Sequence, residues 1–206
     1  MKKIQMITLA IAAFCITIII ALLINELVKS PEPIAQTSEQ SSATPRLSIN
    51  YDLVSHEGKP VRATDFAGRY QLVYFGFAFC PDICPFTLDI MSAALDQIGD
   101  RADKVQPVFI SLDPERDTPE ELATYIQSFY PGFIALTGTE DKIKAAAKSF
   151  KVFFQKVDDP ESTGGYVIDH SSITYLIDPD GDLLHFFTHK DTAETLAAKL
   201  VELVAE

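Results

Sequence analysis

The stretch LVYFGFAF, residues 72–79, runs directly into CPDICP, residues 80–85, and these two segments decide the fold. The first is rich in aromatic and β-branched residues and predicts a buried strand, and a helical pattern follows the second. Cys80 and Cys84 therefore lie at a strand-to-helix junction, where we expect exposed, electrostatically activated thiols. Three chemistries are open to such a pair: thiol–disulfide exchange, peroxide reduction and binding of a soft metal.

Strand-like and helix-like segments alternate along the rest of the chain. Apolar, β-branched and aromatic runs predict strands over 69–79, 105–112, 133–136, 152–157, 172–177 and 183–187. Periodic apolar positions and capping signals predict helices over 85–98, from Thr118 to Pro131, over 140–150 and at the C-terminus. This order indicates an α/β fold of the thioredoxin-like class, with a central mixed sheet and helices on both faces.

The N-terminal segment differs from the rest in composition. Lys2 and Lys3 precede an uncharged, mostly apolar run from Ile7 to Ile24, long enough as a helix to nearly span a bilayer core of about 30 Å. A cleaved signal peptide is the alternative, but no Ala-x-Ala site follows the run. We therefore expect residues 1–28 to be a cytoplasmic N-terminus followed by one transmembrane anchor helix.

The remaining boundaries follow from composition. Residues 29–46 are rich in Ser, Pro, Gln and Glu, which predicts a flexible linker, and residues 47–206 are predicted to form one domain. The anchor's orientation would place this domain in the periplasm, tethered to the inner membrane. The net charge of −12 argues against nucleic acid as a partner.

The two prolines of the cysteine segment constrain its backbone. A residue before proline is disfavoured in helix, so we expect Cys84 at the helix N-cap with Pro85 as the first helical residue. The helix dipole would then make Cys84 the thiolate of the pair. The Cys-x-x-x-Cys spacing is one residue wider than the common redox motif, which favours metal, and so short a loop makes a purely structural disulfide of little value.

Two thiolates rarely complete a metal site, so an imidazole is the next candidate. Of the four histidines, His56, His185 and His189 are taken as ordinary surface or core residues. His170 follows a Gly-Gly loop and stands at the start of a predicted strand, where loops gather at one end of a sheet. Asp169 is a candidate to orient its ring or its loop.

Several motifs together resemble the Sco/SenC proteins. They are FGF at 75–77, CPDICP at 80–85, ISLDPERDTP at 110–119, DHSS at 169–172 and YLIDPDG at 175–181. The resemblance extends from about Leu47 to the C-terminus. Within the third motif, the charged residues from Asp113 to Asp117 are open to two interpretations, a docking surface or a turn that leads into a capped helix.

The resemblance implies a membrane-anchored, copper-binding thioredoxin-like domain that helps to assemble the binuclear copper site of cytochrome c oxidase. It implies Cys80, Cys84 and His170 as ligands of Cu(I) or Cu(II), with the copper-site subunit of the oxidase and a copper donor protein as partners. Thiolates suit Cu(I), and imidazole suits both oxidation states. Phe79 and Phe86 depart from the residues expected in many relatives and make the rim of the site more apolar.

Two functions remain open on these residues. One is a metallochaperone that delivers copper to, or prepares, the oxidase site. The other is a thiol–disulfide oxidoreductase that keeps the cysteines of such a client reduced. Both use Cys80 and Cys84, whereas only copper binding needs His170.

Overall fold

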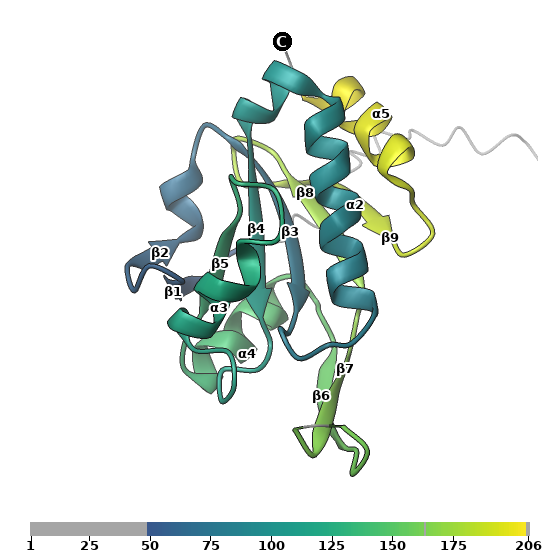
Figure 1. Cartoon of the computed structure of the whole chain (residues 1–206). Coiled ribbons are helices and arrows are strands. Elements are labelled where there is room, and N and C mark those ends of the chain that lie inside the picture. The colour runs from purple at the N-terminus through teal and green to yellow at the C-terminus, as the bar shows by residue number, and fades with distance from the viewer. Residues whose placement is uncertain (1–48, 163, 205–206) are drawn as a thin grey trace, which may run out of the picture. The chain divides into compact units, whose positions relative to one another are not determined.

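The computed structural model describes residues 49–162 and 164–204, which are built on a seven-stranded sheet (Figure 1). Its strands are Asp52–Ser55 (β1), Pro60–Arg62 (β2), Tyr70–Gly76 (β3), Val105–Ser111 (β4), Ile134–Thr137 (β5), Ile173–Ile177 (β8) and Leu183–Thr188 (β9). They lie in the order β2-β1-β5-β4-β3-β8-β9. Strands β3, β4 and β5 are parallel, and the other neighbours are antiparallel, so the predicted mixed sheet of an α/β fold is confirmed.

The central strands carry little but apolar side chains. Every residue of β4 is buried, as is every residue of β3 after Tyr70, which is the pattern of parallel strands covered on both faces. On one side of the sheet, Phe150 packs against Phe75 and Tyr175 at ring-centroid distances of 4.9 and 5.3 Å. This aromatic packing holds β3 in place, and the cysteine segment leaves the sheet at the end of β3.

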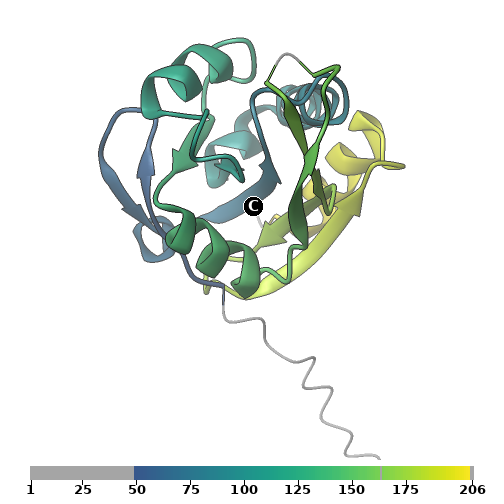
Figure 2. The ribbon, with the colours of Figure 1, turned by 90° about the horizontal axis from the view of Figure 1, so that it is seen from below.

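The helices are α2 (Ile83–Gln97), α3 (Pro119–Ile126), α4 (Glu140–Ser149) and α5 (Ala193–Leu203). Figure 2 shows α2 and α3 on one face of the sheet and α4 on the other. The right-handed crossovers from β3 to β4 and from β4 to β5 place α2 and α3 on the same face. Helix α5 packs beside α2. Helix α3 begins as predicted, with the Thr118 hydroxyl accepting from the backbone N–H of Glu121 and Pro119 at the first position.

Two hairpins complete the domain. Strands β8 and β9 form the predicted one, and its turn is closed by the Asp178 carboxylate, which accepts from the backbone N–H groups of Asp180 and Asp182. The other pairs Phe154–Asp158 (β6) with Tyr166–His170 (β7) in a separate two-stranded sheet. Figure 1 shows this second hairpin projecting from the end of the domain where α2 begins.

The predicted anchor helix and linker lie outside the described residues. Within the part of the chain that the structure describes, no helix combines the length and apolar character needed to cross a bilayer. Three strands, β1, β2 and β7, were not among the predicted elements. Each of these strands is short, and its sequence alone does not indicate a strand. Each is extended because it pairs with a neighbouring strand.

Candidate metal centre

The cysteine segment begins its helix earlier than the prolines suggest. Helix α2 starts at Ile83 with Asp82 as N-cap, so Cys84 lies inside the first turn and the predicted N-cap position for Cys84 is wrong. The N–H groups of the first turn have no intrahelical partner, and Pro85 can occupy that turn without removing a hydrogen bond. The first hydrogen bond of the helix comes after it, from Phe86 N to Asp82 O at 3.2 Å.

Both thiols are buried, which contradicts the expected exposure. Cys84 is 0% exposed and Cys80 is 9% exposed, and both are free. The Cys84 backbone N–H donates to Cys80 Sγ over 3.4 Å, and the Tyr74 hydroxyl donates to Cys84 Sγ over 3.8 Å. Cys84 lies on the buried, apolar face of α2 together with Leu88 and Met91, and this face packs onto the sheet.

The roles of the two thiols are the reverse of those predicted. A hydrogen bond from the Cys84 side chain lowers the pKa of Cys80 to about 4, and hydrogen bonds from His170 and from the backbone of Asp82 and Cys84 add to this lowering. The pKa of Cys84 is raised by its hydrogen bond to Cys80, by burial and by the charge on Cys80. Cys80, which faces the start of the helix, is therefore the thiolate, and Cys84 is the thiol that stabilises it.

His170 reaches the cysteines from a different part of the fold. As predicted, it stands at the entry to the strand that the structure shows as β8, and it is also the last residue of β7, a strand that was not predicted. Its Nε2 lies 3.5 Å from Cys84 Sγ across 86 residues of sequence. Its Nδ1 lies 3.3 Å from the carbonyl oxygen of Ser171. Asp169 is exposed because adjacent strand residues point to opposite sides, so the Ser171 carbonyl, and not Asp169, lies against the ring.

Aromatic rings surround the imidazole and were not among the predicted site residues. Tyr74 and Phe77 meet the His170 ring edge-on at centroid distances of 6.1 and 6.0 Å. Gly76 lies between them in sequence, and a Cβ built there would stand 2.8 Å from Cys84 Sγ. The FGF motif therefore supplies a ring beside the imidazole and the space that the Cys84 sulfur occupies.

The three candidate ligands thus lie together, whereas the other histidines lie elsewhere. His56 accepts from the backbone N–H of Ala135, and His185 stacks against Phe186 on β9. In residues 49–162 and 164–204, no set of three His, Cys, Asp or Glu side chains already forms a metal-holding group. In this structure Cys80, Cys84 and His170 instead form a cluster linked by hydrogen bonds.

The charged residues after β4 form a turn in which Asp113 and Asp117 are buried and Glu115 is exposed. Asp113 is 1% exposed and Asp117 is 0% exposed. Burial raises the pKa of the Asp117 carboxyl to about 6. Asp117 accepts from Ser111 Oγ at 2.5 Å and from the Ala78 backbone N–H at 3.0 Å. Of the two interpretations, the turn is therefore the one that the structure supports.

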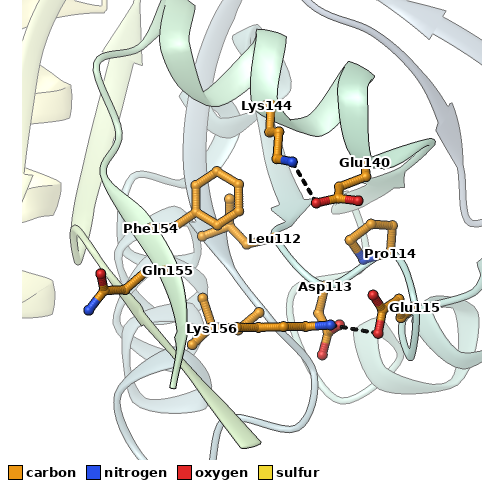
Figure 3. A pocket seen from close by; sticks show the side chains of 10 residues that line it. Leu112, Asp113, Pro114, Glu115, Glu140, Lys144, Phe154, Gln155 and Lys156 are labelled. Carbon is orange, nitrogen blue, oxygen red and sulfur yellow. Dashed lines mark hydrogen bonds and ion pairs between the residues drawn. The ribbon is translucent and has the colours of Figure 1, made fainter. Parts of the chain in front are cut away.

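A cavity of about 290 Å³ lies beside this turn, between α4 and β6 (Figure 3). Leu112, Pro114 and Phe154 give it apolar walls. Figure 3 shows two ion pairs at its rim, Lys144 with Glu140 and Lys156 with Glu115, each with an N–O distance of 2.6 Å. None of the three candidate ligands is among its lining residues, so the cavity is separate from the cysteine–histidine cluster.

The thiol assignment predicts a specific titration. Because the pKa of Cys80 is lowered to about 4, the ultraviolet absorbance of one thiolate should persist in the folded protein until the pH falls towards that value. The thiolate of an ordinary cysteine is protonated as the pH falls below its pKa of about 8.5. Cys80→Ser should abolish this acid-range thiolate, and Cys84→Ser should shift its titration to higher pH by removing the largest lowering contribution. An acid-range thiolate that survives in Cys80→Ser would contradict the assignment.

Comparisons with known proteins agree with this geometry. The sequence model of the SCO1/SenC family matches residues 39–205. Protein sco1 of Schizosaccharomyces pombe is 44% identical over 156 residues, which cover 74% of this chain and 59% of that protein. The chain therefore spans little more than half the length of this curated relative.

Two solved structures carry the comparison further. The crystal structure of Arabidopsis thaliana ScoI with copper bound matches with a TM-score of 0.72 and 36% identity, covering 76% of this chain and 96% of that one. BsSco, described as a member of the Sco family of cytochrome c oxidase assembly proteins in which a disulfide switch was identified, matches with a TM-score of 0.59 and 26% identity, covering 75% and 91%. With its family match spanning most of the chain, this protein belongs to the SCO1/SenC family.

Proposed function

We propose that this chain binds copper as a cargo through Cys80, Cys84 and His170 and delivers it to, or uses it to prepare, the binuclear copper site of cytochrome c oxidase. One observation carries the proposal: an imidazole nitrogen lies 3.5 Å from a cysteine sulfur that is itself hydrogen-bonded to a second cysteine. Two sulfurs and one imidazole form a donor set that suits copper, since thiolate favours Cu(I) and imidazole accepts both oxidation states.

The remaining parts of the proposal rest on sequence and on relatives. Arabidopsis ScoI was solved with copper bound, and BsSco is described among oxidase assembly proteins. The apolar run from Ile7 to Ile24 supports a single-pass anchor in the inner membrane, with the metal-binding domain facing the periplasm. The proposed partners are the copper-site subunit of the oxidase and a donor protein that supplies the ion.

A thiol–disulfide reductase is the second candidate, favoured by the lowered pKa of Cys80. The Cys80 thiolate would attack a client disulfide and release one client thiolate. Deprotonated Cys84 would then attack Cys80 in the mixed disulfide and release the second client thiolate. Two electrons pass to the client, and Cys80 and Cys84 end as a disulfide. One pair cannot serve both candidate functions at once. Bound copper would occupy the thiolate that attacks the client disulfide, and reductase turnover would leave a disulfide that has no thiolate for copper.

The experiment that tests the copper proposal is an anaerobic titration of the reduced chain with Cu(I) under competition with a chelator of known affinity. We expect one copper per chain, and we expect Cys80→Ser and Cys84→Ser each to weaken binding. The same two variants, expressed in cells that lack the native protein, should fail to restore the oxidase copper site. Unchanged binding in both variants, or restored assembly despite lost binding, would contradict the proposal.

A further inference from the structure

The turn from Asp113 to Asp117 lies between the two segments that carry the candidate ligands. On one side, the Asp117 carboxylate accepts from the backbone N–H of Ala78, two residues before Cys80. On the other side, the Tyr166 hydroxyl donates to Asp113 Oδ1 over 2.8 Å, and Tyr166 is the first residue of the strand that ends at His170. One short turn thus contacts both the β6–β7 hairpin and the loop between β3 and α2, residues 77–82, which we call the cysteine loop.

Arg116 contacts both sides of this junction. Its Nε donates to the buried Asp113 carboxylate, and its Nη1 donates to the backbone carbonyl of Tyr166 over 3.2 Å. The guanidinium carbon lies 3.7 Å from the centroid of the Tyr166 ring. The side chain of Arg116 is only 13% exposed, so these charge-assisted contacts are largely shielded from water.

The same guanidinium also faces the cysteine loop. It lies 4.8 Å from the Phe79 ring and 5.9 Å from the Phe77 ring, both within the range of cation–π attraction. Phe79 is the residue before Cys80, and Phe77 packs edge-on against the His170 ring. Arg116 is therefore placed between the sulfur-bearing loop and the imidazole-bearing hairpin.

The hairpin has a glycine, Gly164, where the Arg116 guanidinium lies against it. A Cβ built on Gly164 would stand 2.0 Å from Arg116 Nη1, so any larger residue there would displace the guanidinium. On the ring of Tyr166, Lys156 Nζ also lies 4.3 Å from the centroid and pairs with Glu115 of the same turn. The turn and the hairpin are thus joined by two cations and two carboxylates around one aromatic ring.

We propose that Arg116 is a positioning residue which, with Asp113 and Tyr166, holds the β6–β7 hairpin against the cysteine loop and so fixes His170 beside Cys84. The hairpin pairs with no strand of the main sheet, so its position depends on its short connections to α4 and β8 and on side-chain contacts such as these. The inference rests on the proposed copper site for its functional meaning, and on the contacts above for the placement of His170.

Arg116→Met tests the proposal, since it keeps the length of the side chain and removes its charge and hydrogen bonds. We expect copper affinity to fall about 10- to 100-fold, as for other partners that orient a metal ligand. In a His170→Ala background the same change should alter affinity by no more than a factor of about two, because the ligand that Arg116 positions is already absent. An equal loss in both backgrounds would overturn the positioning role.

The control is Arg69→Met, which removes an arginine with two hydrogen bonds, to Gln106 and Asp103, at the start of β3. It should leave copper affinity unchanged. In the copper-free protein, the NMR signals of the His170 imidazole should move in Arg116→Met and stay in place in Arg69→Met. This readout needs no metal. A wild-type chain that takes up no copper would therefore defeat the proposed function alone, whereas unmoved His170 signals would defeat the positioning role.

Two milder variants guard against a folding defect in Arg116→Met. Gly164→Ala should displace the guanidinium with its charge intact, and Tyr166→Phe should remove only the hydroxyl that donates to Asp113. Both should shift the His170 signals in the same direction as Arg116→Met, Tyr166→Phe by less. A shift in neither variant, with both proteins folded, would count against the proposal.

Discussion

Replacing His170 with Ala is expected to weaken copper binding by more than about 100-fold, since losing a ligand should exceed the loss of a residue that merely orients one. Thiol–disulfide exchange should survive the change. The largest contribution that lowers the pKa of Cys80 is the hydrogen bond from Cys84, and that of His170 is smaller. The nucleophile therefore stays a thiolate at neutral pH without the imidazole.

The measurement pairs an anaerobic copper titration with an insulin-type reductase assay on the same preparations. His185→Ala is the matched control, because that imidazole stacks on Phe186 at an edge strand and contacts neither thiol in the described structure. It should bind copper like the unmodified protein. Equal copper affinity in His170→Ala and His185→Ala would refute the ligand assignment, and parallel loss of both activities in His170→Ala would refute the separation of roles.

Gly76→Ala is expected to have the second large effect, because the strand leaves no room for a methyl group. The new Cβ would stand 2.8 Å from Cys84 Sγ and 3.1 Å from ring atoms of both Phe109 and Tyr74. All three neighbours are fully buried, so none can turn away into solvent. Overpacking of this kind destabilises a domain by about 1–3 kcal/mol. The sulfur must also move, and we expect copper affinity to fall about tenfold or more.

Chemical denaturation and copper titration of the same variant measure both effects. Gly138→Ala is the comparison, since its added Cβ has one close neighbour, the terminal Cδ2 of Leu53 at 3.1 Å, and otherwise meets the Lys142 side chain at 3.7 Å. Neither residue is near the candidate ligands in sequence. This variant should have a smaller effect on stability and none on copper. A Gly76→Ala protein that keeps wild-type stability and affinity would show that the Cys84 sulfur is not confined as described.

The main elements of the fold could be predicted because their residues carry strong local signals. The buried apolar run of β3, the Leu88 and Met91 spacing in α2 and the Thr118–Pro119 start of α3 each specify one structure within a short window. The β6–β7 hairpin has no such signal. Its second strand, which includes Asp169 and His170, is extended because it pairs with Phe154–Asp158. The local sequence of that strand does not indicate this pairing.

The candidate ligands were predictable, but their environment was not. The preference of a residue before proline for extended backbone predicted Cys84 at the N-cap. The first turn of a helix tolerates proline, however, so α2 begins at Ile83 and includes Cys84, which is buried. The burial of Cys84 raises its pKa, and its hydrogen bond to Cys80 lowers the pKa of Cys80, so Cys80 is the thiolate. The contacts of Arg116 with Tyr166 join residues 50 positions apart, a relation that exists only in the folded chain.

The three candidate ligands stand on parts of the fold that are held unequally, because His170 belongs to the separate β6–β7 sheet. Cys84 is held by α2 and the main sheet, whereas the hairpin contributes one buried apolar side chain, Ile168, to the core, and its other apolar side chains there are only partly buried. Lifting the hairpin would expose less apolar surface than opening β3, which is buried at every residue after Tyr70. Its opening free energy should therefore be a fraction of that for global unfolding, and its amides should exchange hydrogen before those of β3. For the proposed copper site, we therefore expect the imidazole to detach first on metal release, while both sulfurs still hold the ion.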